Sequence, residues 1–594
     1  MARVIELTTP LGKDVLLFRA MHGREELARM SEFDLSALSS RADISPGDLL
    51  GKNVTVKLEL LGGGYRYFDG HVARFTQGGM VGRYYQYRMT ARPWLWFLTR
   101  TADCRIFQEK TVPEILKEIF ADHAMAIFED GLTGTYAKRE YCVQYRETDF
   151  NFVSRLMEEE GIYYYFDHKD GRHVLKLVDS YSGHKALEHK ATIAYYPPGK
   201  AIRADEEFIH AWTFAQGVQP GAVALDDYDF TKPKADLTVK AKLVQKHERA
   251  DYEVFDYPGE YQQTGDGEQY VRARIDELHA EFERAEAECN VREIAVGRLF
   301  NFTNAPRRDQ EREYLIVSAA HYLQDNAYET SASEGVSYHC SFTALQSRQQ
   351  FRAARTTPEP RVSGPQTAVV VGPGGEEIWC DKYGRVKVQF HWDRYGKKDE
   401  NSSCWIRVAN PWAGANWGGI ALPRIGQEVI VDFLEGDPDQ PIITGRVYNA
   451  AQMPPYELPA NATQTGIKTR SSKGGGAANF NELRFEDAKG KEQVFVHAEK
   501  NLDLRVKNES REFVGKDAHV IVEGNRNEQV GQDHYLKSGV KIVIEAGMEL
   551  TLKSSGGFIK IDPSGIYING TMVFINSGGT PGVIPKPPDE AEKG

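Results

Sequence analysis

The chain has 594 residues, a formal net charge of −12 at pH 7 and a pI near 5.8. Hydrophobic residues make up 41% of it and charged residues 27%, which is typical of a folded protein with several domains, each with its own core. The acidic balance excludes a nucleic acid or an anionic membrane surface as the main partner.

The sequence contains no apolar run that approaches the length of about 18 residues that a membrane-spanning helix needs. The N-terminus, MARVIELTTPLGKDVLLFRAMHG, alternates like a strand and lacks the charged-then-apolar layout of a signal peptide. The six cysteines have no CxxC spacing and indicate reduced, mostly buried thiols, so a disulfide between Cys380 and Cys404 is not expected. These features predict a cytosolic protein that leaves the cell, if at all, without a cleaved signal.

The region from Met1 to about Phe351 is expected to be α+β with predominantly β content. A first helix is expected to begin with Asp149 as its cap and to end at Gly161. The apolar face of this helix carries Phe150, Val153, Leu156 and Met157. A second helix is expected over residues 268–289, and its apolar stripe is Ile275, Leu278 and Phe282. Strands are expected at IYYYF after the first helix and in RRDQEREYLIVSAAHYL after the second.

Three groups of residues could form a catalytic, metal or ligand site, but a structural role is favoured for each. The acidic run Glu158–Glu160 could hold paired carboxylates, but consecutive helical residues point in different directions, so we expect a solvated face offset by Arg155 or a neighbouring chain. His391 and Asp393 share one face of an expected strand but have no evident third metal ligand. Core filling is the expected role of the aromatic cluster Trp94, Trp96 and Phe97. We therefore predict no catalytic residue, no metal site and no cofactor.

The segment QQFRAARTTPEPRVSGPQTA, residues 349–368, is polar and rich in Pro and Arg, as linkers are. Five strand-like runs follow, namely TAVVVG, RVKVQFHW, CWIRVAN, QEVIVDFLEG and QPIITGRVYN. Five short strands without room for a helix predict a small closed barrel such as an OB-fold. Residues 361–450 hold 10 Lys and Arg against 11 Asp and Glu, so the basic groove that nucleic-acid binding requires is not expected.

After a Gly- and Asn-rich neck, the sequence alternates apolar and polar residues in short bursts that recur about every eight residues. Pro is absent from Ala460 to Asp562, which suits a continuous hydrogen-bonded ladder. Each unit has room for one strand but no second layer, so other chains must cover its apolar face. The inward-facing residues are expected to be Val520, Val522, Ile542, Ile544, Leu550, Leu552, Ile559, Ile561, Ile566 and Ile568.

An ordinary sandwich of meandering strands would show the same alternation and stays open as an alternative. Hairpin dipeptides such as Asn-Gly are nearly missing between the bursts, which favours the solenoid. The sequence after Asn576, SGGTPGVIPKPPDEAEKG, is rich in Pro and is expected to be disordered.

Five stretches carry a family resemblance, and they follow one another in a fixed order along nearly the whole chain. They are RPWLWFLTRTADCRIFQEKTVPEILKEIF, YCVQYRETDFNFVSRLMEEEGIYYYF, VGRLFNFTNAPRRDQEREYLIVS, the run from DKYGRVKVQFHW to PIITGRVYN, and the eight-residue strand repeat. Together they resemble the VgrG family, the spike of the bacterial type VI secretion system, which is similar to the fused hub and spike proteins of contractile phage tails.

The resemblance implies a mainly β protein with an α+β hub similar to phage tail hubs, an OB-fold barrel and a C-terminal intertwined triple-stranded β-helix. Three copies of the chain would each supply every third strand of that helix. The expected parts are the hub at 1–360, the OB-fold barrel at 361–450, a neck at 451–490, the β-helix at 491–577 and a disordered tail at 578–594.

By the same resemblance the protein is expected to be a homotrimeric spike that caps the inner tube, punctures target membranes and delivers effectors. The implied partners are an Hcp tube hexamer at the hub, baseplate components, and a PAAR-repeat protein with an effector at the tip. Nucleic acid is not an expected partner. The target membrane is expected to be crossed only mechanically. The protein would be cytoplasmic before firing and secreted by the type VI system without a signal peptide. The tip contact is expected at Met572, Val573, Phe574 and Ile575.

A spike that carries its own enzyme, a peptidoglycan hydrolase or a toxin, is the alternative function, since phage spikes of this architecture can carry a lysozyme domain and some family members carry a C-terminal toxin. The neck offers about 40 residues and 18 follow Asn576, which is short of the roughly 50 residues that a folded domain needs. We therefore expect a spike that is not an enzyme.

Overall fold

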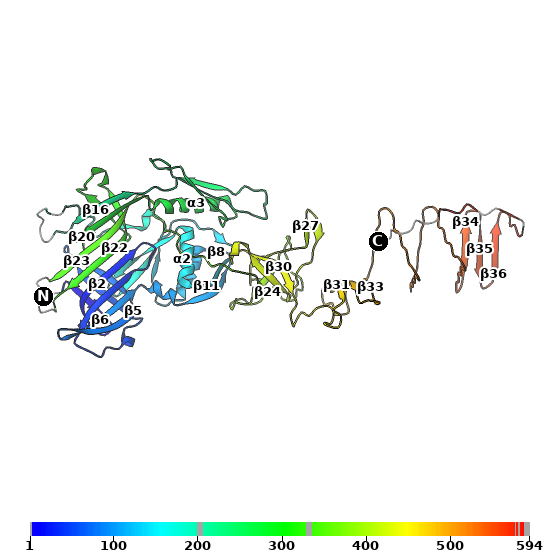
Figure 1. Cartoon of the computed structure of the whole chain (residues 1–594), viewed down its shortest axis with the longest axis horizontal. Coiled ribbons are helices and arrows are strands. Elements are labelled where there is room, and N and C mark those ends of the chain that lie inside the picture. The colour runs from blue at the N-terminus through cyan, green and yellow to red at the C-terminus, as the bar shows by residue number, and fades with distance from the viewer. Residues whose placement is uncertain are drawn as a thin grey trace. The chain divides into compact units, whose positions relative to one another are not determined.

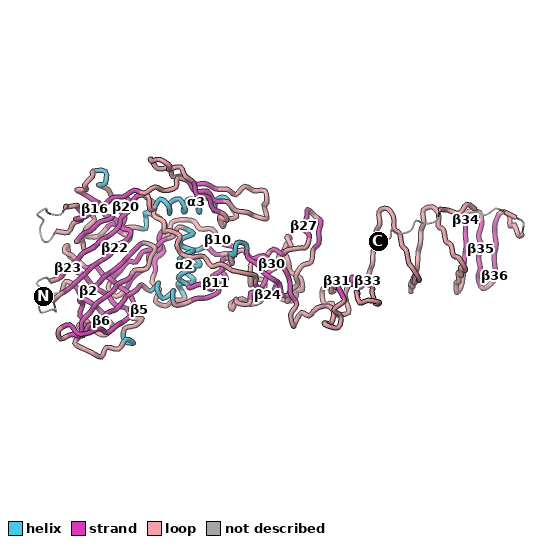
Figure 2. The backbone as a smooth tube through the Cα atoms, in the orientation of Figure 1, coloured by secondary structure: helices cyan, strands magenta, loops and turns pink. Residues whose placement is uncertain are grey.

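The computed structural model describes residues 3–197, 199, 206–327, 335–576, 578–579 and 582–586. The chain forms two compact units, one of Met1–Gln464 with Ser471–Gly476 and the other of Thr465–Arg470 with Ala477–Gly594. Strands predominate in the described residues of both units, and three α-helices lie in the first (Figures 1 and 2). This confirms the mainly β fold class.

A 13-stranded sheet forms the body of the first unit. Its main path runs through β1 (Ile5–Thr8), β4 (Asn53–Glu59), β5 (Tyr65–Val81), β6 (Tyr84–Arg92), β3 (Glu32–Ser39), β2 (Leu17–Glu26), β22 (Glu313–Asp325), β23 (Val336–Gln346), β20 (Glu283–Cys289) and β16 (Ile209–Gln216). The strands β14 (Lys185–Ala186), β15 (Thr192–Ala194) and β21 (Arg298–Thr303) join beside this path. The antiparallel pairing of β2 with β22 unites the beginning of the region with its end, so the sheet is one body (Figure 1).

Alternation along these strands buries one face of the sheet, because successive side chains point to opposite sides. The core under β2–β6 includes Phe33, Leu35, Phe68, Tyr87 and Met89, all buried. A second core continues under β20–β23. On the opposite face, the part of the sheet around Arg74, Asp34 and Tyr322 is open to solvent.

Two helices and short sheets form a second layer with its own core. The helices are α1 (Val112–Ala121) and α2 (Asp149–Glu160), and the strands are β7 (Ala102–Phe107), β8 (Lys110–Thr111), β9 (Phe128–Asp130), β10 (Lys138–Arg139), β11 (Cys142–Thr148), β12 (Tyr163–Lys169) and β13 (Arg172–Val178). The cap of α2 is Thr148, whose hydroxyl accepts from the Asn151 amide at 3.1 Å, so the prediction of Asp149 was wrong by one residue. Gly161 ends α2 in the left-handed conformation, as predicted.

The third helix, α3 (Thr264–His279), covers a small sheet of β17 (Ala222–Leu225), β18 (Val239–Lys242) and β19 (Glu253–Asp256). The expected helix over residues 268–289 was too long, because residues 283–289 form β20. Their sequence, ERAEAEC, is rich in helix formers, but its alternate residues are buried between neighbouring strands. Tertiary pairing therefore overrides local helix propensity here. Short 3-10 turns occur at Pro46–Asp48, Trp94–Thr99, Tyr181–Gly183, Arg308–Gln310 and Leu434–Gly436.

A five-stranded barrel-like sheet follows residues 351–365, which carry no helix or strand, in agreement with the predicted linker. Its order is β25 (Lys387–Phe390), β24 (Gln366–Val371), β29 (Glu428–Phe433), β30 (Pro441–Val447) and β26 (Arg407–Val408), one strand for each predicted run. The sequence did not predict the extra hairpin of β27 (Trp412–Gly414) and β28 (Trp417–Gly419). Val370, Val388 and Val431 are fully buried in the core of this sheet.

The second unit contains two separate three-stranded sheets. The first consists of β31 (Gln464–Lys468), β32 (Glu482–Glu486) and β33 (Gln493–His497), and the second of β34 (Leu550–Ser554), β35 (Gly557–Asp562) and β36 (Gly565–Gly570). Between them, residues 498–549 are all described, yet they form no helix or strand with their own chain. In Figure 2 this stretch is drawn as loop that runs back and forth. The predicted disordered tail, 578–594, falls mostly outside the described residues.

Candidate functional site: the uncovered apolar faces of the C-terminal unit

The sheet of β34, β35 and β36 carries two rows of apolar side chains on one face. Its strands are joined by two-residue turns at 555–556 and 563–564 and pair antiparallel in sequence order. The register places six apolar residues opposite one another, in the rows Leu550–Ile561–Ile566 and Leu552–Ile559–Ile568. In the single chain this face is open, with Leu552 55% and Ile566 68% exposed. An apolar face of this kind requires a covering partner.

The other face of the same sheet is mainly polar, although Phe558 and Tyr567 also lie on it. Lys560 lies 3.0 Å from the carboxylates of both Glu549 and Asp562. Hydrogen bonds from the Ser564 hydroxyl and from Lys560 lower the pKa of Asp562 to about 2. The sheet therefore has one face suited to water and one suited to a core, as the alternation predicted.

The preceding sheet repeats this arrangement. Leu483 pairs with Val496, and Phe485 pairs with Val494, all on one face. These four side chains are exposed in the single chain. Both ends of the second unit therefore present uncovered apolar sheets.

The stretch 498–549 has unpaired backbone as well as uncovered side chains. No backbone–backbone hydrogen bond joins two of its described residues to each other or to strands elsewhere in the described chain. The predicted inward residues Val520, Val522, Ile542 and Ile544 are all exposed. Since backbone groups and apolar side chains of a folded segment need partners, this stretch is incomplete as a single chain.

The last strand is followed by four apolar residues. Met572, Val573, Phe574 and Ile575 belong to no strand and are all exposed. They lie beyond β36, whose second edge pairs with no described strand. An open strand edge next to exposed apolar side chains favours association with another protein.

The acidic run Glu158–Glu160, which the sequence analysis weighed as a catalytic site, is packed against arginines in the first unit. Glu158 and Glu159 are buried, and Glu160 is half-buried, so the prediction of a solvated acidic face was wrong. Arg29 lies 3.1 Å from Glu158, and Arg139 lies 2.7 Å from Glu159 and 3.1 Å from Glu160. Arg155 lies 3.6 Å from Glu159, as the sequence had suggested. Burial would raise the pKa of Glu159, but the two arginines outweigh it and lower that pKa.

The other candidates also have structural roles. His391 is exposed and lies 3.0 Å from the Thr367 hydroxyl, beyond the end of β25 and therefore not on the strand face that the sequence suggested. The side chain of Trp94 is buried in the core of α1 and α2, where its indole donates to the Ile127 carbonyl at 3.1 Å. All six cysteines are free thiols, as predicted. Within the described residues, no group of three His, Cys, Asp or Glu is arranged to hold a metal ion.

Sequence reasoning missed the in-chain pairing of the last three strands. It expected each chain to supply every third strand, whereas β34, β35 and β36 are consecutive neighbours in one sheet. The signal was present in the two-residue links Ser555–Gly556 and Pro563–Ser564, which are short enough for hairpins. The meander that the sequence left open as an alternative therefore exists locally.

Three families match successive parts of the chain. The family described as phage tail baseplate hub (GPD) matches residues 24–327. The type VI secretion system/phage-baseplate injector OB domain matches residues 379–448, and the bacteriophage T4 gp5 C-terminal trimerisation domain matches residues 465–552. The second unit thus begins where a trimerisation domain begins.

Curated relatives extend this likeness over most of the chain. The type VI secretion system spike protein VgrG1b of Pseudomonas aeruginosa is 52% identical over 516 residues, which are 87% of this chain and 70% of the relative. The chain belongs to the VgrG family of type VI secretion system spike proteins. A second VgrG of the same organism, VgrG1a, is 48% identical and covers 98% of this chain and 95% of its own. The actin cross-linking toxin VgrG1 of Vibrio cholerae is 36% identical, and the match covers 96% of this chain but 55% of that protein.

Solved structures show the VgrG fold. The c3393 protein of E. coli, a component of the type VI secretion system with structural similarity to the T4 tail proteins gp27 and gp5, matches with a TM-score of 0.53 at 20% identity. That match covers 74% of this chain and 100% of c3393. The Francisella PdpA–VgrG complex matches with a TM-score of 0.55 at 8% identity and covers 93% of this chain and 76% of its own. Among the described residues, no helix is long and apolar enough to cross a membrane.

Proposed function

We propose that three copies of this chain wind around one another along residues 491–577 and form the shaft of a type VI secretion spike. The alignment of apolar side chains into rows that are open in a single chain carries this proposal. The residues proposed to face the shared core are Val520, Val522, Ile542, Ile544, Leu550, Leu552, Ile559, Ile561, Ile566 and Ile568.

The energy available to such an assembly is large. Burying one Leu or Ile side chain contributes about 1.5–3 kcal/mol. The six aligned residues of the last sheet alone would contribute on the order of 10 kcal/mol per chain, before the entropy of association is subtracted. A shaft whose backbone is paired between chains along its length is also stiff, and a puncturing device needs stiffness.

The mass of the native particle tests the trimer. Light scattering on the purified full chain is expected to give three times 66.9 kDa, because folded single chains would leave the rows exposed. A stable, folded monomer at micromolar concentration would contradict the shaft and, with it, the spike function.

We further propose that Met572, Val573, Phe574 and Ile575 seat a PAAR-repeat protein that closes the tip and brings an effector. The support is the position of these exposed residues after the last strand, beside an open strand edge. Strand edges of three chains could receive a cap by β-augmentation.

Two truncations test the tip. A chain that ends after Gly570 loses the apolar run and is expected to lose PAAR-repeat protein in a pull-down, while light scattering still reports a trimer. A chain that ends after Asn576 keeps the run, loses only the segment that follows it, and is the matched control. Equal capture by both truncated chains would move the contact elsewhere on the spike.

For the other end, we propose that the hub, residues 1–360, joined through an OB-fold at 361–450 and a neck at 451–490, sits on an Hcp tube hexamer within the baseplate. Membership of the VgrG family supports this arrangement. Co-sedimentation of the full chain with purified Hcp rings tests it, and failure to associate at low and high protein concentration would count against it.

The proposed action is mechanical. The spike waits in the cytoplasm, leaves through the type VI apparatus without a signal peptide, and carries an effector across the target membrane. An enzymatic spike is the weaker alternative, because the families that match this chain are described as hub, OB domain and trimerisation domain.

A further inference from the structure

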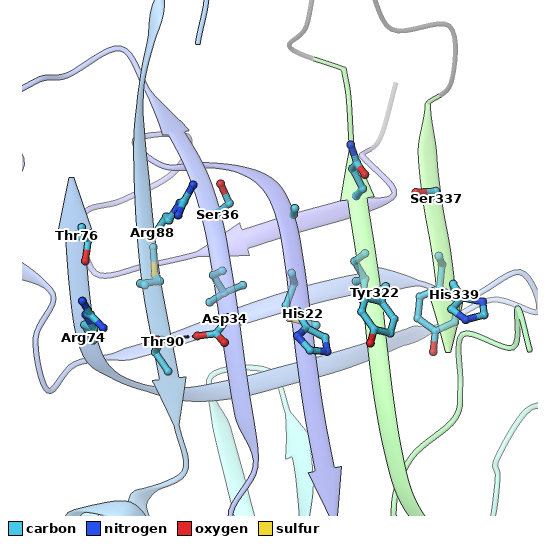
Figure 3. A pocket seen from close by; sticks show the side chains of 17 residues that line it. His22, Asp34, Ser36, Arg74, Thr76, Arg88, Thr90, Tyr322, Ser337 and His339 are labelled. Carbon is cyan, nitrogen blue, oxygen red and sulfur yellow. Dashed lines mark hydrogen bonds between the residues drawn. The ribbon is translucent and has the colours of Figure 1, made fainter. Parts of the chain in front are cut away.

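A ladder of polar and aromatic side chains crosses six strands of the hub sheet on its open face. Cross-strand register places the members directly opposite one another from β5 through β6, β3, β2 and β22 to β23. In that order they are Arg74, Thr90, Asp34, His22, Tyr322 and His339 (Figure 3). We call this row the hub ladder. With strands about 4.8 Å apart, it extends over about 24 Å.

The hub ladder lies on a hollowed surface, not in a core. Its residues line a cavity of about 700 Å³ together with a parallel row two positions along, which includes Arg88 opposite Thr76. The side chains that alternate with them, such as Leu35 and Met89, are buried on the other face. Tyr322 is 46% exposed, which is high for an aromatic residue in the middle of a sheet.

The contacts within the ladder leave Arg74 unpaired in the described part of the chain, and Arg88 of the parallel row is unpaired there as well. Asp34 is satisfied by the Thr90 hydroxyl, which donates to it at 2.7 Å. The rings of His22 and Tyr322 stack with their centroids 4.5 Å apart, and Tyr322 and His339 follow at 6.0 Å. Among the described residues, neither Arg74 nor Arg88 has a hydrogen-bond or ion-pair partner.

A third arginine continues this pattern. Arg24 lies two residues beyond His22 on the same face of β2, is exposed, and is likewise without a partner among the described residues. The guanidinium group binds carboxylates through two parallel hydrogen bonds, and such pairs strengthen when a ligand excludes water. Three unpaired guanidinium groups around a stacked His–Tyr platform therefore favour an anionic ligand with planar groups.

We propose that the hub ladder binds an extended acidic segment of a partner protein, with carboxylates on Arg24, Arg74 and Arg88 and an aromatic or peptide plane on the His22–Tyr322 stack. This goes beyond the proposed spike function and does not depend on the trimer shaft or on the tip. It names a second binding surface, at the hub.

Charges of the opposite sign on the same face select a peptide over a nucleic acid. Glu32, which forms an ion pair with Arg92, lies opposite Arg24, and Glu288 continues the face beyond β23. A phosphodiester chain carries a charge at every unit and meets these carboxylates wherever it lies, whereas a peptide places its acidic residues only at the arginines.

Fluorescence anisotropy on the full chain tests the ladder with a labelled 12-residue peptide of Glu, Tyr and Gly. The charge reversal Arg74→Glu with Arg88→Glu is expected to weaken binding at least about tenfold, because two bidentate pairs become repulsions. The matched control is Arg172→Glu with Arg348→Glu, two exposed arginines away from the ladder that change the net charge equally. The control is expected to bind within about twofold of the original chain, since long-range charge is screened by salt.

A second variant and a second probe complete the test. Tyr322→Ala is expected to weaken the peptide about threefold to tenfold without changing the salt dependence, because it removes the platform and no charge. Equal losses in the control and the ladder variants, binding of labelled single-stranded DNA as tight as that of the peptide, or no peptide binding at low salt would each overturn the proposal. All variants alter exposed side chains, and light scattering with circular dichroism verifies that they fold.

Discussion

Arg155 lies among oxygen acceptors at the inner side of α2. Its guanidinium donates to the Val143 carbonyl and to Glu147, both at 2.9 Å, and lies 3.6 Å from Glu159. Burial would lower its pKa, but Glu159 and Glu147 outweigh burial and raise it. Arg155 is therefore a buried charge with paired partners, and the loss of one partner would leave the other uncompensated.

Asp439 shows the opposite situation where the OB sheet meets β11. Its carboxylate accepts from the Val143 amide at 2.6 Å, while its own amide donates to Asp437 at 2.8 Å. Burial, and then the nearby Asp437 carboxylate, raise the pKa of Asp439 to about 8. Because its pKa in the folded state is above the unfolded value, the folded chain is favoured at low pH, and this contribution is lost as pH rises from about 4 to about 8.

The substitution Asp439→Asn removes the carboxyl whose ionisation lowers the stability of the folded chain. The side-chain amide of Asn keeps an oxygen that accepts from the Val143 amide. We expect it to raise the melting temperature at pH 9 by about 2–4 °C and to have little effect at pH 5, where the carboxyl is protonated. Differential scanning fluorimetry across pH checks this. Asp432→Asn, at an exposed position on β29, is the control, and a gain at pH 9 that persists unchanged at pH 5 would contradict the assignment.

The acidic run Glu158–Glu160 shows what sequence could not predict at the residue scale. The three side chains were expected in solvent because consecutive helical residues point in different directions. The structure covers them with Arg139 from an earlier strand and with the amides of Thr356 and Thr357, which donate to Glu158 at 2.9 Å. These partners come from distant segments, and no local spacing rule identifies them.

At the element scale, the strands of the OB sheet were predictable because each is an alternating run bounded by turn residues. The β27–β28 hairpin was missed, since its residues are exposed and give no burial pattern. Residues 283–289 were included in the second helix, which was predicted from the apolar stripe Ile275, Leu278 and Phe282. Pairing with β16 and β23 makes these residues a strand instead. The hydrophobic pattern thus predicts strands that bury one face in a core. It fails where pairing with neighbouring strands decides between helix and strand.

The C-terminal unit was predicted as alternating strands, and the candidate core residues were chosen on alternation alone. Alternation fixes which residues share a face but not which chain supplies the neighbour. The pairing of β34 with β35 and β36 within one chain depends on turns that the sequence analysis passed over.

Adjacent residues on β34 provide a matched test of the inward face. Leu552→Asp would bury three like charges near the shared axis, and we expect trimer yield to fall more than about tenfold. Thr551→Asp adds the same charge on the polar face and is expected to leave the yield within about twofold. Size-exclusion chromatography with light scattering reads both, and unchanged assembly of Leu552→Asp would show that the inward register is wrong.

At the scale of the whole molecule, the two units should differ in resistance to unfolding. The first unit has linkers and small satellite sheets that can open locally, whereas the proposed pairing between chains would close the second along its length. We expect protease in intermediate urea to digest the hub first and to leave a trimeric C-terminal fragment. Mass spectrometry of the surviving fragments identifies them, and a hub that outlasts the shaft would reverse this order.

The two in-chain sheets of the second unit have a consequence for how three identical chains find their alignment. The units within 498–549 resemble one another, so a chain displaced by one unit could still place apolar residues against its neighbours there. Such a slip would place the β34–β36 sheet of one chain beside single strands of the other chains. At the opposite end, the β32–β33 sheet of that chain would no longer lie beside the β32–β33 sheets of the others. The apolar rows within each terminal sheet would stay aligned, because they are formed within one chain, but they would no longer face the rows of the neighbouring chains. In the proposed trimer the two terminal sheets would therefore fix the registry that the repeat between them leaves open.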